Sequence, residues 1–228
     1  MKPIIGIIAR VEYPGNTHKL AMNESVRRKI IEYGANPILI LPPQNIDYSI
    51  VHYSEQQELT EEEKTMLIEQ IKLCNGILMS GGFKINKFDR FIAEYVTDNN
   101  IPLLGICLGL QIMANYKKEL WLEKNNSFIE HKQEEGLVHS VTIDKSSKLY
   151  EIIGQEKIMV NSRHSFHVLP NNHYKISSVS DDNYIESIEM KDKIFNIGVQ
   201  WHPENMNDES SDRLFEKFIE ACKNNITY

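Results

Sequence analysis

The first half of the chain alternates short runs of β-branched and apolar residues with segments of helical periodicity. Residues 4–8 (Ile-Ile-Gly-Ile-Ile) and 38–41 (Ile-Leu-Ile-Leu) are typical of buried strands. Between them, apolar residues recur at helical spacing and stop at Gly34. A strand, a helix and a second strand in this order form a βαβ unit with parallel strands. The alternation therefore predicts an α/β chain with a parallel sheet covered by helices.

The same alternation continues to about residue 116, and then the pattern changes. Thr60 and Glu63 have the spacing of a capping box and predict the start of a helix that ends before Gly76. Residues 138–200 alternate in the manner of strands and carry turn signals, which predicts a mostly antiparallel region. The remaining predicted elements are strands at 77–79 and 101–106, helices at 86–99, 108–116 and 211–223, and a surface loop at 44–59.

Composition favours an ordinary globular protein over several other classes. The chain has 228 residues, 41% of them hydrophobic and 25% charged, which argues against a disordered, collagen-like or coiled-coil chain. We expect one domain over residues 1–228. The net charge is −7, and no Lys/Arg-rich run with interleaved aromatic residues is present in the sequence. Nucleic acid is therefore not an expected partner.

The cysteine and apolar patterns also limit the location and the cofactors that we expect. Cys74, Cys107 and Cys222 lie far apart, so neither a disulfide framework nor a CxxC metal site can be inferred. The longest apolar stretch, 101–114, falls short of the ~20 residues of a membrane helix. No signal cleavage site is evident. We expect a cytoplasmic protein that does not associate with membranes and needs no metal or cofactor.

The string Gly105-Ile106-Cys107-Leu108-Gly109 lies between a predicted strand and a predicted helix. This is the G-x-nucleophile-x-G elbow with cysteine as the nucleophile. The helix N-terminus favours a thiolate at Cys107, and the N–H of Leu108 would face a developing oxyanion. The alternative is that Cys107 is an ordinary core thiol.

A histidine and a carboxylate follow a second apolar strand near the C-terminal end of the chain. Residues 195–199 are apolar, His202 comes just after them, and Glu204 is two residues further on. Functional sites of open α/β sheets collect at such strand ends. The order Cys107, His202, Glu204 therefore suits a nucleophile, a general base and a carboxylate that orients the base. A histidine that only satisfies its own hydrogen bonds is the alternative.

Several other residues have two interpretations that the sequence leaves open. Gly81 and Gly82 follow a strand and could supply bare N–H groups to an oxyanion, or could form a simple turn. Arg10 and Arg163 could bind a substrate carboxylate or could be solvated. His131 and His139 have no metal-ligand spacing and are expected to be surface or core residues.

With these motifs the chain resembles the class I glutamine amidotransferase superfamily. It resembles more narrowly the γ-glutamyl hydrolase-like peptidases (peptidase C26), which include γ-glutamyl-γ-aminobutyrate hydrolase. The likeness covers nearly the whole chain. It is carried by residues 3–7, 34–42, 80–82, the elbow strand 101–111 (IPLLGICLGLQ), the Val160-Asn161-Ser162-x-His164 string, and Gly198-Val199-Gln200-Trp201-His202-Pro203-Glu204.

The resemblance implies a flavodoxin-like three-layer sandwich and a set of site residues. Cys107, His202 and Glu204 would form the catalytic triad, and Gly82 and Leu108 would supply the oxyanion N–H groups. Substrate contacts would come from Gly81, Gln111 and His164.

The resemblance also implies the reaction, but it leaves the amine half of the substrate open. The leading hypothesis is a cysteine hydrolase that cleaves the γ-glutamyl amide bond of a small compound through a thioester. One alternative is a glutaminase subunit that supplies ammonia to a separate synthase, and another is a non-catalytic γ-glutamyl sensor. A homodimer or a synthase partner is left open. The chain departs from the hydrolase pattern after Gly82, at Leu108 and after His164, where Phe83, Ser165 and Phe166 stand.

Overall fold

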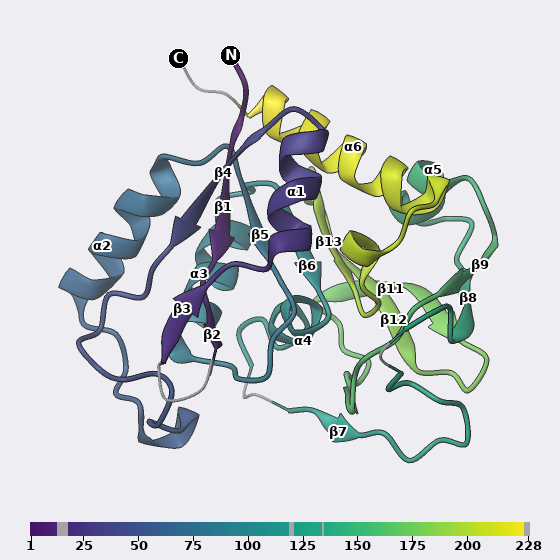
Figure 1. The fold of residues 1–228 in the computed structure, drawn as a ribbon, viewed down its shortest axis with the longest axis horizontal. Helices are drawn as coiled ribbons and strands as arrows, with labels where there is room; N and C mark the ends of the chain where they lie inside the picture. Colours follow the sequence, from purple (N-terminus) through teal and green to yellow (C-terminus); the bar gives the residue numbers. More distant parts are fainter. Residues whose placement is uncertain (13–17, 119–120, 134, 226–228) are drawn as a thin grey trace.

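The computed structural model describes residues 1–12, 18–118, 121–133 and 135–225, and a long mixed sheet runs through the molecule (Figure 1). In the described residues this sheet has nine strands in the order β4-β1-β5-β6-β13-β12-β11-β8-β9. Neighbours from β4 to β13 are parallel, and neighbours from β13 to β9 are antiparallel. The flavodoxin-like fold with an antiparallel extension, expected from the sequence, is confirmed.

The strands divide into two halves, which we call the parallel half and the antiparallel half. The parallel half consists of β4 (Asn36–Ile40), β1 (Ile4–Ile8), β5 (Gly76–Met79), β6 (Leu103–Ile106) and β13 (Asn196–Val199). The antiparallel half consists of β12 (Ile185–Met190), β11 (Tyr174–Ser180), β8 (His139–Ile143) and β9 (Lys157–Val160). Two small ribbons lie outside this sheet: β2 (Arg10–Glu12) with β3 (Lys19–Ala21), and β7 (Glu123–Lys124) with β10 (Phe166–His167).

Helices cover both faces of the sheet, so the molecule has three layers. On one face lie α1 (Glu24–Glu32), α5 (Lys148–Ile153) and α6 (Glu209–Asn224), and on the other lie α2 (Glu61–Lys72), α3 (Lys87–Asp98) and α4 (Leu108–Ala114). In Figure 1, α1 and α6 cross in front of the sheet and α3 lies behind it.

Strand alternation explains why two hydrophobic cores form. In β5, the Leu78 side chain joins the core under α1 and α6, while Ile77 and Met79 join the core under α2, α3 and α4. Successive side chains of a strand point to opposite faces, so a strand that is apolar throughout must be covered on both sides. This is the pattern that the apolar runs in the sequence predict.

Local signals place most helix ends correctly, with one helix missed. The predicted capping box is present, because the Thr60 hydroxyl accepts from the Glu63 N–H and the Glu63 carboxylate accepts from the Thr60 N–H. The predicted loop 44–59 contains only a short 3₁₀ turn, η1 (Tyr53–Glu55). The helix α5 was not predicted, since its six residues are too few to show helical periodicity.

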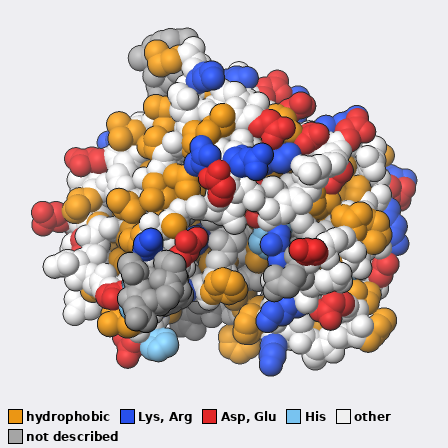
Figure 2. All heavy atoms as spheres, in the orientation of Figure 1, with side chains coloured by type: hydrophobic (Ala, Val, Ile, Leu, Met, Phe, Trp, Pro, Cys, Tyr) orange, Lys and Arg blue, Asp and Glu red, His pale blue; other side chains and the backbone are white. Residues whose placement is uncertain are grey.

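The surface is consistent with the acidic composition. On the face shown in Figure 2, acidic and basic side chains are interspersed rather than gathered by sign. Among the described residues, no helix combines the length and the apolar character that crossing a bilayer requires.

Candidate active site

Three neighbouring strands of the parallel half end at the same edge of the sheet and carry the candidate residues. In the registers of the sheet, Met79 of β5 pairs with Gly105 of β6, and Ile106 of β6 pairs with Val199 of β13. Two residues after β5 comes Gly81, directly after β6 comes Cys107, and three residues after β13 comes His202. Parallel strands run in the same direction, so these segments emerge side by side at their carboxyl ends.

Cys107 occupies a strained turn at the first end of α4. Its φ of 52° and ψ of −103° lie in a region that costs a residue with a side chain of the order of 1–3 kcal/mol. Gly109 makes the turn possible, because a Cβ there would lie 2.1 Å from the Met79 carbonyl oxygen. The elbow holds the sulfur over the strand end, but the residue is only 7% exposed. The sulfur therefore lines a cavity and does not stand free above the sheet, as the elbow motif alone would suggest.

His202 lies beside the sulfur and is held by a carboxylate. Its Nδ1 donates to Glu204 Oε1 at 2.8 Å, and its ring also hydrogen-bonds to the Cys107 side chain. Burial disfavours the charged imidazole, but the negative charge of Glu204 and the contact with Cys107 outweigh burial and raise the pKa of His202 to about 10. The ring is therefore an imidazolium at neutral pH.

Asn161 fixes the backbone of His202, and the sequence pattern assigned it no role. The Asn161 amide donates to the His202 carbonyl at 2.9 Å and accepts from the His202 N–H at 2.8 Å. The Asn161 side chain therefore ties the end of β9 to the segment after β13. It belongs to the Val160-Asn161-Ser162-x-His164 string, which was the signal that could have pointed to it.

Two backbone N–H groups face the space beside the sulfur. Leu108 is the first residue of α4, where an N–H has no carbonyl one turn earlier. Among the described residues, neither Gly82 N–H nor Leu108 N–H donates a backbone hydrogen bond. Both residues line the same cavity as Cys107.

Arg10 supports the glycine turn from below. It is 7% exposed, donates from Nε and Nη2 to the Ser80 carbonyl at 3.1 Å, and forms an ion pair with the buried Asp89. Of the two interpretations left open by the sequence, solvation is therefore wrong for Arg10. Its guanidinium fixes Ser80, the residue that leads into Gly81 and Gly82.

A cavity of about 580 Å³ opens beside Cys107 and has a cationic wall. The charged residues that line it are Arg10, Lys84, Lys132 and Arg163, and the described lining residues include no Asp or Glu. In a chain of net charge −7, this wall is a local reversal of sign. A cavity of this size suits a small ligand, and its charge suits an anionic one.

Gln111 also lines this cavity, and its amide is already bonded to the protein. Gln111 Nε2 donates to the Phe166 carbonyl at 3.1 Å and to Gln200 Oε1 at 3.3 Å. The amide therefore holds the wall segment around Phe166 against the core.

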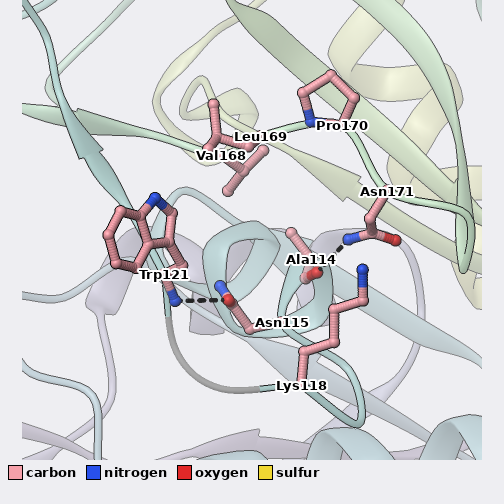
Figure 3. A pocket seen from close by; sticks show the side chains of 8 residues that line it. All are labelled: Ala114, Asn115, Lys118, Trp121, Val168, Leu169, Pro170 and Asn171. Atoms are coloured by element: carbon pink, nitrogen blue, oxygen red, sulfur yellow. Dashed lines mark hydrogen bonds between the residues drawn. The ribbon is translucent and has the colours of Figure 1, made fainter.

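A second, smaller hollow lies away from the sulfur (Figure 3). Two side-chain amides brace its walls: Asn115 accepts from the Trp121 N–H, and Asn171 donates to the Ala114 carbonyl. The only charged group among its eight lining residues is Lys118. It offers no nucleophile or base, so the candidate site is the cavity at Cys107.

His164 lies at the boundary between the Cys107 cavity and a group of buried histidines. Its Nδ1 faces the Phe166 carbonyl at 2.9 Å, and its Nε2 lies 3.2 Å from His131 Nδ1. Both ring nitrogens therefore face protein groups rather than the cavity. His139 and Glu186 complete the group, which the sequence did not indicate because its members come from separate segments.

Comparison with known proteins identifies relatives over most of the chain. The family model for peptidase C26 matches residues 86–204. The glutamine-hydrolysing subunit of GMP synthase from Archaeoglobus fulgidus is 32% identical over 164 residues, which are 71% of this chain and 83% of that protein. The CTP synthase of Mesoplasma florum is 26% identical over 77% of this chain, but the chain spans only 39% of its length.

Solved structures show the same fold. The glutaminase domain of Trypanosoma brucei CTPS with bound acivicin superimposes with a TM-score of 0.66, covering 98% of this chain and 94% of that one. The two sequences are 18% identical, so this likeness supports the architecture alone.

Proposed function

The chain belongs to the peptidase C26 family of the class I glutamine amidotransferase superfamily, and from this premise we propose that it hydrolyses γ-glutamyl amides through a thioester on Cys107. One observation carries the proposal: Cys107, His202 and Glu204 meet in a continuous chain of contacts at the edge of a cationic cavity. A core thiol or an isolated histidine requires no such alignment.

The first step uses the charge state of His202. As an imidazolium, it leaves Cys107 as a thiolate, and Glu204 stabilises the positive ring. The thiolate attacks the γ-carbonyl carbon, so a C–S bond forms and the carbonyl oxygen becomes an oxyanion. The N–H groups of Gly82 and Leu108 would hold that oxyanion, and one such donor contributes about 10²–10³ in rate.

The second step releases the amine and the third releases glutamate. The His202 imidazolium transfers its proton to the departing nitrogen as the C–N bond breaks, which leaves a neutral imidazole and a thioester. The imidazole then takes a proton from water, whose oxygen attacks the thioester carbon. The C–S bond breaks, glutamate leaves, and the thiolate–imidazolium pair is restored.

The cationic wall narrows the substrate class. Arg10 and Arg163 lie on the same cavity wall as Lys84 and Lys132, and together they favour the α-carboxylate of a glutamyl group. They also disfavour a leaving group that carries amines, because like charges would face each other. We infer that γ-glutamyl amino acids or glutamine are better substrates than γ-glutamyl polyamines.

A glutaminase subunit is the second candidate, and the comparison with the glutamine-hydrolysing subunit of GMP synthase favours it. This chain spans 83% of that subunit, so the two proteins are similar in extent. In this case glutamine would be the natural substrate and a synthase partner would accept the ammonia. A non-catalytic sensor is less well supported, because a strained elbow at Cys107 would have no use in simple binding.

A substrate panel tests these alternatives. Purified protein is incubated with glutamine, a γ-glutamyl dipeptide and a γ-glutamyl polyamine, and released glutamate is measured. Cys107→Ala should abolish release, whereas Cys74→Ala, a buried thiol outside the site, should retain it. Slow hydrolysis of glutamine alone would select the glutaminase subunit. Release that persists in Cys107→Ala, or no release from any compound, would overturn the proposal.

A further inference from the structure

Four buried side chains of the antiparallel half converge on one point. His131 comes from the loop after β7, His139 from the start of β8, His164 from the loop after β9, and Glu186 from β12. Each of the four residues is at most 5% exposed, and one nitrogen or oxygen of each lies within 4.8 Å of the others. We call these four residues the His₃Glu cluster.

The spacing inside the cluster matches a tetrahedron of metal ligands. Glu186 Oε1 lies 3.5 Å from His131 Nδ1, 3.7 Å from His139 Nε2 and 3.5 Å from His164 Nε2. A further edge, from His131 Nδ1 to His164 Nε2, is 3.2 Å. Zn²⁺ bonds of ~2.0–2.2 Å to nitrogen and oxygen place tetrahedral ligands ~3.3–3.6 Å apart. The side chains therefore already stand at the separations that a four-coordinate ion requires.

The outward nitrogen of each ring faces an acceptor. His131 Nε2 lies 2.9 Å from the Asp182 carboxylate, His164 Nδ1 lies 2.9 Å from a backbone carbonyl, and His139 Nδ1 lies 3.3 Å from another. An N–H on each outward nitrogen leaves the lone pair of the other nitrogen directed inward. Carboxylates and carbonyls in these positions are the usual supports of metal-binding histidines.

The inward atoms lack adequate partners among the described residues. Both carboxylate oxygens of Glu186, which is 0% exposed, and Nε2 of His139 have no hydrogen bond. Burying a carboxylate without hydrogen bonds is costly, and such groups are normally paired or bound to a metal. Three neutral imidazoles supply lone pairs rather than positive charge, so the cluster needs a cation.

We propose that the His₃Glu cluster binds one Zn²⁺ ion in a closed tetrahedral site. Three imidazoles and one carboxylate suit zinc or a similar transition metal, whereas Mg²⁺ and Ca²⁺ prefer oxygen ligands throughout. The charges also balance, because Glu186 and the supporting Asp182 together offset the ion. A shallow cavity lined by His131 and His164 gives the metal a path from solvent.

The site would fix the wall of the Cys107 cavity. Lys132 follows the ligand His131, while Arg163 and Ser165 flank the ligand His164, and all three line that cavity. The ion would therefore hold two loops together across the antiparallel half. Its four ligands come from the protein, so its role would be structural and it would take no part in the hydrolysis.

Metal content and cobalt substitution test the site in the whole chain. Protein purified without chelator should contain one zinc per chain by elemental analysis. After chelation, Co²⁺ should give the intense visible absorption of a four-coordinate ion, and one equivalent of Zn²⁺ should abolish it. Glu186→Gln should weaken Zn²⁺ binding by at least about 100-fold, and Asp182→Asn, which only supports a ligand, by about 10–100-fold.

The matched control is His167→Gln, and it guards against loss of folding. His167 is buried beside the cluster, but its ring nitrogens face Asn125 and Glu123. This variant should bind Zn²⁺ as the wild type does. Zn²⁺ should raise the unfolding temperature of chelated wild type and His167→Gln but not of Glu186→Gln. Folded wild-type protein that takes up neither Zn²⁺ nor Co²⁺ would overturn the proposal and leave a hydrogen-bonded histidine cluster only.

Discussion

The parallel and antiparallel halves of the sheet both bury histidines, but they hold them in different ways. In the parallel half, His202 stands at a strand end beside Glu204 and Cys107, and these neighbours raise its pKa to about 10 although burial opposes this. In the antiparallel half, burial dominates and lowers the pKa of His131, although Asp182 and Glu186 favour the charged form. The first ring is cationic and the second is neutral. One position suits a proton donor and the other suits a ligand that offers a lone pair.

The two halves also differ in how their residues come together. The parallel half places successive strand ends side by side, so Cys107 and His202 meet because β6 and β13 are neighbours. The antiparallel half brings the His₃Glu cluster together from two strands and two loops. If this contrast is right, changes in one half should alter turnover and leave metal binding intact.

The strongest test of the contrast is His202→Gln. Loss of the proton donor should lower kcat by about 10³–10⁴-fold, because no other group at the described strand ends can protonate the leaving amine. Zinc content should stay at the wild-type value. His173→Gln, which alters a histidine packed against Tyr116 outside both sites, should change neither quantity. A fall in kcat of less than about 10-fold would contradict the assignment of His202.

Gly81→Ala tests the packing of the same half without removing a reactive group. A Cβ at Gly81 would lie 2.8 Å from Cε1 of His202, so the ring would have to move away from the sulfur. A displacement of this kind costs about 10²-fold in kcat. The unfolding temperature should change little, since the ring lies at the cavity edge.

Gly34→Ala provides the converse control. Gly34 has a φ of +85°, and no described atom lies within 4 Å of the position that a Cβ would take, so alanine there is strained but not crowded. It should lower the free energy of unfolding by about 1 kcal/mol and leave kcat unchanged. Equal losses of kcat in the two glycine variants would show that Gly81 acts through general stability.

Asn161→Asp tests the one side chain that links the two halves at the active site. The aspartate still accepts from the His202 N–H but no longer donates to the His202 carbonyl. With one of two hydrogen bonds lost, we expect kcat to fall by about 10-fold, which corresponds to about 1.4 kcal/mol. Asn161→Ala should fall further. If both variants kept full activity, the clamp would have no part in positioning His202.

The sequence predicted the parallel half well and the antiparallel half poorly, for a physical reason. The elbow around Cys107 and the pair His202 and Glu204 are short segments whose geometry is set locally. Strand ends of a parallel sheet then meet by topology alone. Such features can be inferred from neighbouring residues, so the fold and the approximate place of these residues followed from the chain.

The His₃Glu cluster had no such local signal. His131 and Glu186 are 55 positions apart by residue number, and the contact between them depends on the registers of β8, β11 and β12. A register is a property of strand pairing, and one residue of slip would turn Glu186 to the other face. The sequence for this reason predicted His131 and His139 as unrelated residues and gave His164 a role at the substrate.

The smallest expected effect is that of pH on the wild-type enzyme near neutrality. The pKa of His202 is raised from its ordinary value of 6.5 to about 10, so the ring keeps its proton throughout the neutral range. A raised pKa means that the folded state holds the proton more tightly. The contribution of this proton to stability is therefore complete below pH 6.5 and is lost as the pH rises through about 10.

Turnover should follow the same ionisation, because His202 must be protonated when the amine leaves. We expect kcat to vary by less than about two-fold between about pH 7 and pH 8.5 and to fall as the pH approaches 10. Steady-state assays across this range, with NMR of the His202 ring in parallel, measure both quantities. A ring that loses its proton between about pH 6 and pH 7 would show that Glu204 and Cys107 do not outweigh burial. The two halves would then hold histidines of the same charge, and the contrast between them would fail.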